Sequence, residues 1–78
     1  MKVTIVHTTG PQMNDFRLDV IEVPGMFTEQ VKSLAPARNR HYRKRSRTWE
    51  VDTNPYGNEI ISEIGRLGHS VEIREERV

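Results

Sequence analysis

At 78 residues the chain is long enough for one small domain and too short for two units that each bury a core. Hydrophobic residues make up 35% of it, and a mean hydropathy of −0.69 leaves no surplus for a membrane span. We therefore expect one soluble domain over residues 1–78 and exclude a large multi-step enzyme.

The cysteine count and the first residues bear on the compartment. The chain has no cysteine, which excludes disulfides, thiolate metal sites and cysteine nucleophiles. Residues 1–9 carry one lysine and an apolar stretch that threonines interrupt, too short for the apolar region of a signal peptide. The sequence therefore predicts a cytoplasmic protein.

Alternating β-branched residues predict a first strand over residues 2–8. Gly10-Pro11 and Asn14-Asp15 bracket a predicted loop. A second strand follows over residues 16–23, because Phe16, Leu18 and Val20 alternate with charged residues. We expect the two strands to pair as a hairpin.

Two helices are predicted from apolar spacing and end signals. The first covers residues 28–35, with Thr28 as N-cap and Pro36 as the stop. The second has Asn54 as cap, Pro55 at its first position and Gly68 at its end. A last strand follows, in which Val71 and Ile73 alternate with charged residues.

These elements, with a hairpin between the helices, give the order ββαββαβ. That order predicts an α+β domain, a mostly antiparallel sheet with two helices on one face. The predicted core is Val3, Ile5, Phe16, Leu18, Val20, Phe27, Val31, Leu34, Trp49, Val51, Ile60, Ile64, Leu67, Val71 and Ile73. So thin a core favours marginal stability or a homodimer.

The formal charge of +1 hides a strong local asymmetry. Residues 38–47 contain six cations and no acid, whereas the rest of the chain sets six cations against all eleven acids. A Trp-Glu-Val alternation and a capped helix follow, so this basic window lies inside the fold. If Arg45-Ser46 forms a turn, Tyr42 lies opposite Trp49 and His41 opposite Glu50. The window is then a hairpin with a cationic tip.

Cations concentrated at a turn repel one another unless a polyanion neutralises them, and phosphates do so with release of counterions. Nucleic acid is the leading partner, with DNA favoured over RNA. The candidate binding residues are Arg38, Arg40, His41, Tyr42, Arg43, Lys44, Arg45, Arg47 and Trp49. The basic side chains would contact phosphates, and Tyr42 or Trp49 would stack on a base. The only tryptophan of a small chain, however, more often belongs to the core.

Other interpretations of the basic window remain open. The hairpin could dock on an acidic partner protein, as a small phage-type modulator would, or on the acidic remainder of a second copy. A nuclear localisation signal normally lies on a tail, and a membrane patch would need an amphipathic helix or a lipidation site. We find neither, and expect no membrane attachment.

The sequence predicts no catalytic residue, no metal site and no cofactor. Its three histidines lie on separate predicted elements without metal-binding spacing, and His7 and His69 fit structural positions. A nuclease could pair His41 with Glu50 across the hairpin, but metal-dependent cleavage normally needs more carboxylates.

From Phe27 to Ile73 the chain has a helix, an Arg-rich stretch with Tyr42, the run Arg47-Thr48-Trp49-Glu50-Val51, a second helix ending at Gly68, and a strand. This order resembles the small HARP-type domain of annealing and branch-migration helicases, and similar free-standing phage modules. The resemblance implies a non-catalytic DNA-binding domain that recognises branched or single-to-double-strand junctions. Where this chain has Arg43-Lys44-Arg45, that family often carries Asp or Pro. The leading hairpin, residues 2–23, lies outside the resemblance.

Overall fold

The computed structural model describes residues 1–13 and 16–77, and their elements follow the predicted order ββαββαβ. The strands are β1 (Lys2–Met13), β2 (Phe16–Pro24), β3 (Arg40–Arg43), β4 (Thr48–Asp52) and β5 (Ser70–Arg77). The helices are α1 (Thr28–Leu34) and α2 (Asn58–Arg66), with 3-10 turns at Gly25–Phe27 and Ala37–Asn39 and a π-type turn at Thr53–Gly57. The predicted α+β fold is confirmed.

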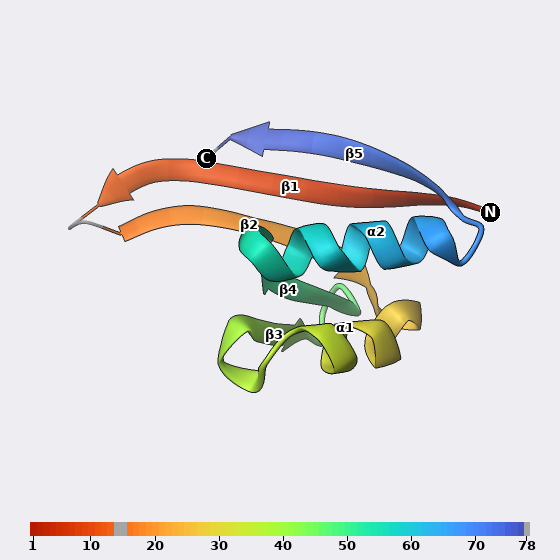
Figure 1. The fold of residues 1–78 in the computed structure, drawn as a ribbon. Coiled ribbons are helices and arrows are strands. Elements are labelled where there is room, and N and C mark those ends of the chain that lie inside the picture. Colours follow the sequence, from red (N-terminus) through yellow and green to blue (C-terminus); the bar gives the residue numbers. More distant parts are fainter. Residues whose placement is uncertain (14–15, 78) are drawn as a thin grey trace.

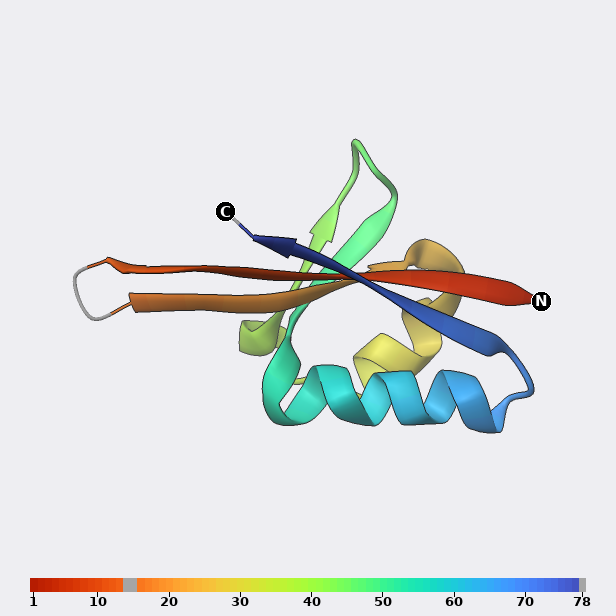
Figure 2. The same ribbon diagram turned by 90° about the horizontal axis from the view of Figure 1, so that it is seen from above.

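The strands form one sheet in the order β3-β4-β2-β1-β5. Neighbouring strands run antiparallel except β1 and β5, which are parallel. Both helices pack on the same face of the sheet, so the opposite face is open (Figures 1 and 2). Neither helix of the described chain is long and apolar enough to cross a membrane.

Strand β1 is longer than predicted. Its pairing with β2 continues to Met13 opposite Phe16, and the register shifts between Thr9 and Gln12. A bulge accommodates an extra residue where glycine and proline interrupt a strand, so residues 10–11 irregularly extend β1 and do not open a loop. The predicted turn residues Asn14-Asp15 lie outside the described residues.

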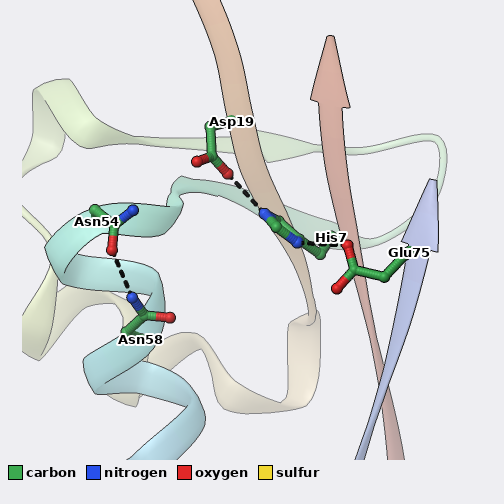
Figure 3. Close-up of polar contacts among 5 residues, drawn as sticks. All are labelled: His7, Asp19, Asn54, Asn58 and Glu75. Atoms are coloured by element: carbon green, nitrogen blue, oxygen red, sulfur yellow. Dashed lines mark hydrogen bonds and ion pairs between the residues drawn. The ribbon is translucent and has the colours of Figure 1, made fainter. Parts of the chain in front are cut away.

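The predicted start of each helix is corrected. Phe27 occupies the cap position of α1, while the Thr28 hydroxyl donates to the Gly25 carbonyl oxygen at 2.6 Å. Helix α2 begins at Asn58, and the Asn54 side chain accepts a 2.6 Å bond from the Asn58 side-chain amide instead of capping the backbone (Figure 3). The predicted end of α2 at Gly68 is confirmed, because Gly68 has a φ of +97°, a conformation that favours glycine.

The segment just before α2 packs tightly against β2 and β4. A Cβ on Gly57 would lie 3.0 Å from two Ile21 side-chain carbons and 3.2 Å from the Asp52 carbonyl oxygen. The chain therefore turns closely over β2 at Gly57, and regular helix begins only after this contact.

The buried apolar residues among those described are Val3, Ile5, Ile21, Val23, Phe27, Val31, Ala35, Trp49, Val51, Ile60 and Ile64. Eight of these were predicted. Ile21, Val23 and Ala35 were missed, and Leu67 and Ile73, predicted as core, are exposed. Leu34 and Val71 are partly buried against the core, and the Phe16 side chain lies outside the described residues.

The core residues of β2 were predicted on the wrong face of the strand. Ile21 pairs with Val51 and Val23 with Trp49, so the odd-numbered residues of β2 face the helices. Successive strand residues point to opposite faces, which puts Leu18 and Val20 on the open face. Val20 and Ile21 are both apolar, and the sequence does not show which of the two alternating sets is covered.

Candidate nucleic-acid interface

The basic window forms the predicted hairpin. In β3 and β4, Tyr42 pairs with Trp49, His41 with Glu50 and Arg43 with Thr48. Residues 44–47 form the connecting turn, so Arg45-Ser46 lies at its centre as expected.

The hairpin tip is anchored to the rest of the fold. The Gly25 N–H donates to the Arg47 carbonyl oxygen at 2.9 Å, and a Cβ on Gly25 would lie only 2.8 Å from that oxygen. Thr48 donates to the Glu22 carboxylate at 3.1 Å and lies 2.6 Å from the Ser46 hydroxyl. These contacts fix the turn against the end of β2, although Arg47 has a φ of +56°, which is uncommon outside glycine.

Arg40, one of the predicted phosphate contacts, bonds to backbone carbonyls of the fold. Its Nη1 donates to the Ala35 carbonyl oxygen at 2.6 Å and to the Lys32 carbonyl oxygen at 3.3 Å. Its guanidinium carbon also lies 5.9 Å from the centroid of the Trp49 ring, within cation–π range. These carbonyls belong to the end of α1, where a cation is favourable, so Arg40 joins α1 to the hairpin.

Arg43 is also engaged within the hairpin. Its Nη1 lies 2.6 Å from Oε2 of Glu50, and both side chains are partly exposed. His41 and Glu50 face each other across the hairpin as predicted, and Arg43 bonds to one oxygen of the Glu50 carboxylate.

The two aromatic candidates differ in exposure. Trp49 is 9% exposed, and its indole N–H donates to the Thr28 hydroxyl at 2.9 Å, so it is a core residue. Tyr42 packs against Trp49 with ring centroids 5.1 Å apart and remains 38% exposed. Of the two, Tyr42 retains surface on which a base could stack.

Four cations of the basic window remain available for a partner. Among the described residues, Arg38, Lys44, Arg45 and Arg47 are exposed and form no ion pair with a carboxylate. Three of them share the four-residue turn. Arg38 lies at the other end of the hairpin, where it lines a hollow of about 150 Å³ together with His41, Glu50 and Asp52, among others. The predicted patch is thus a concentrated tip and one separate arginine.

A second polar cluster ties three strands together at His7. Its Nε2 lies 2.7 Å from Oδ1 of Asp19 on β2, and its Nδ1 lies 2.7 Å from Oε2 of Glu75 on β5 (Figure 3). Carboxylate oxygens only accept, so both ring nitrogens must carry protons. The hydrogen bond to Asp19 raises the pKa of His7 above 6.5, burial opposes this rise, and the bond to Glu75 adds to it. These contacts favour the imidazolium form of His7, which links β1 to both neighbours.

The free energy of unfolding should depend on pH through His7. Because its pKa is higher in the folded than in the unfolded state, its contribution is complete below about pH 6.5 and is lost as pH rises through the folded pKa. One proton limits the loss to about 1.4 kcal/mol per pH unit. Urea unfolding of the wild type and His7→Gln at several pH values checks this. The stabilities should converge as pH rises, and parallel profiles would contradict the assignment.

Two features of this site were not visible in the sequence. The roles of Arg40 and Arg43 depend on which carbonyl or carboxylate lies nearby, and the link from His7 to Glu75 depends on the parallel pairing of β1 with β5.

Comparisons of the chain with protein-family models, with curated proteins and with solved structures found no match in any of the three.

Proposed function

We propose that the protein is a non-catalytic nucleic-acid-binding accessory protein that contacts phosphates through the tip of the β3–β4 hairpin. One observation carries the proposal: Lys44, Arg45 and Arg47 are exposed, without carboxylate partners among the described residues, in a turn that Gly25 anchors. A turn whose conformation is already fixed loses little conformational entropy when it binds a partner. Cations that already lie close together gain most from a chain of phosphates.

The charge on the rest of the sheet supports this orientation. On the open face, Glu22 lies opposite Glu50, and the next position along β4 on that face is Asp52. Arg43 neutralises Glu50, but Glu22 and Asp52 repel phosphate, so this part of the open face suits nucleic acid less well than the cationic tip does. A strand of DNA would instead approach the tip, with Tyr42 beside it for stacking.

We expect the preferred nucleic acid to be DNA with unpaired nucleotides. The order of elements that resembles the HARP-type domain implies branched or forked DNA. A short cationic tip beside a partly exposed tyrosine suits unpaired nucleotides next to a duplex end, because phosphates and one unstacked base are both accessible there. We therefore expect binding to decrease in the order forked DNA, single-stranded DNA, blunt duplex.

A salt series tests the proposal. With contacts from Arg38, Lys44, Arg45 and Arg47, the affinity for single strands should fall about 50-fold between about 50 mM and 200 mM salt. The measurement is fluorescence anisotropy with labelled forked, single-stranded and duplex DNA and with RNA of equal length. An affinity that does not change with salt would exclude the electrostatic mechanism. Equal affinity for fork and blunt duplex would remove the junction preference.

A further inference from the structure

Strand β5 forms one edge of the sheet. It has eight residues and pairs with β1 on one side, and no other strand of the described chain lies on its free side. The opposite edge is β3, which has only four residues. Short edge strands resist pairing with other chains, whereas a long edge strand presents a row of unpaired backbone groups. The free side of β5 is therefore the edge better able to bind another strand.

The backbone direction of β5 fixes which residues can pair. The Ser70 N–H donates to the Met1 carbonyl oxygen at 3.0 Å, toward β1. Because N–H and C=O groups alternate in side along a strand, Val71, Ile73 and Glu75 direct theirs toward the free edge. In an antiparallel partner, these three would form the hydrogen-bonded pairs, and the even-numbered residues would lie in the closer, non-hydrogen-bonded pairs.

Charge selects one register if the partner is a second copy of β5. With the two-fold axis at Ile73, Glu72 of each copy lies opposite Arg74 of the other, so the two close pairs that flank the axis join opposite charges. A shift of the axis by one residue sets Glu72 against Glu72, or Arg74 against Arg74. An axis at Glu75 would pair Arg74 with Glu76 but set Glu75 against Glu75. Charges on an edge strand normally discourage any pairing, but here their order favours self-pairing in this register.

The apolar side chain at the axis supports the same register. Ile5 of β1 is fully buried, whereas its partner Ile73 of β5 is 41% exposed. A second copy would continue the row as Ile5, Ile73, Ile73 and Ile5 across the interface.

We propose that the protein forms a two-fold homodimer through antiparallel pairing of β5 at Ile73, joining two sheets into one of ten strands. This proposal does not rest on nucleic-acid binding.

Cross-linking of single-cysteine variants tests the register, because the chain has no cysteine of its own. In the proposed dimer the Ile73 Cα atoms lie about 5.5 Å apart, within disulfide range. Ile73→Cys should give a disulfide-linked dimer under mild oxidation. Ser70→Cys is the matched control, since the two Ser70 residues lie six positions out of register, about 20 Å apart. Equal cross-linking of both variants would overturn the proposal.

Charge exchange tests the pairing independently. By sedimentation equilibrium, Glu72→Arg and Arg74→Glu should each weaken dimerisation at least about tenfold, because each replaces two attractive pairs by two repulsive ones. The double variant should restore it. Circular dichroism checks that each variant is folded. If one single variant does not fold, the other alone is enough to test the pairing. A wild type that stays monomeric up to about 500 μM would refute the dimer, and so would a dimer that survives the single exchanges.

Discussion

The Trp49→Ala variant should lose about 3–5 kcal/mol of unfolding free energy, the cost of removing a buried large aromatic side chain. Trp49 lies between Tyr42, Arg40 and Thr28, and its removal leaves a cavity and takes away the N–H bonded to the Thr28 hydroxyl. A domain of this size has a total stability of roughly 4–12 kcal/mol. The variant should therefore unfold at a much lower urea concentration than the wild type, measured by urea titration of the far-ultraviolet circular dichroism.

Trp49→Phe is the matched control. It keeps an aromatic ring in the core but removes the indole N–H, so the hydrogen bond to Thr28 is lost without most of the cavity. A neutral hydrogen bond contributes about 1 kcal/mol, so this variant should remain folded and be clearly more stable than the alanine variant. If Trp49→Ala unfolds at nearly the wild-type urea concentration, Trp49 does not hold the hairpin to α1.

Neutralising the hairpin tip should weaken binding to single-stranded DNA about 100-fold at about 0.1 M salt. The variant combines Lys44→Gln, Arg45→Gln and Arg47→Asn, since asparagine tolerates the positive φ at that position. Loss of three phosphate contacts should also lower the salt slope by about two, because each contact to a single strand contributes about 0.7. Arg40 and Arg43 are left in place because they bond to other parts of the fold.

The control for this variant removes the same charge elsewhere. Lys32→Gln, Arg66→Gln and Arg77→Gln together change the net charge from +1 to −2, as the hairpin variant does. All three residues are exposed and lie outside the hairpin. If affinity depended only on net charge, the two triple variants would bind alike. We expect the control to retain most of its affinity, which would assign binding to the tip.

Local signals in the sequence were sufficient for the order of the elements and for the register of the β3–β4 hairpin. The alternation around Arg45-Ser46 predicted the hairpin register that places Tyr42 opposite Trp49. The spacing of Ile60 and Ile64 predicted the buried side of α2, and Gly68 predicted its end. These succeeded because hairpin pairing and helix periodicity depend on residues close together in the chain.

Features that depend on side-chain geometry or on the order of the strands could not be read in the same way. Arg40 and Arg43 look like phosphate ligands until the carbonyl of Ala35 and the carboxylate of Glu50 are placed beside them. All six cations of the basic window look equivalent in the sequence, and only the folded structure shows that two of them, Arg40 and Arg43, bond to other groups of the protein. The exposure of Ile73 depends likewise on strand order, since it becomes an edge residue only because β5 lies outside β1.

The pairing of β1 with β5 also affects how the chain folds during synthesis. Partners in β3 and β4 are 5 to 11 residues apart, whereas every pair between β1 and β5 is 68 residues apart. Contacts between residues far apart in the chain cost more loop-closure entropy and form late in folding. On the ribosome, β1 can pair with β2 early, but its other side must wait until β5 has emerged. Until then β1, an interior strand of the finished sheet, is an edge strand, and an unpaired edge exposes a nascent chain to aggregation.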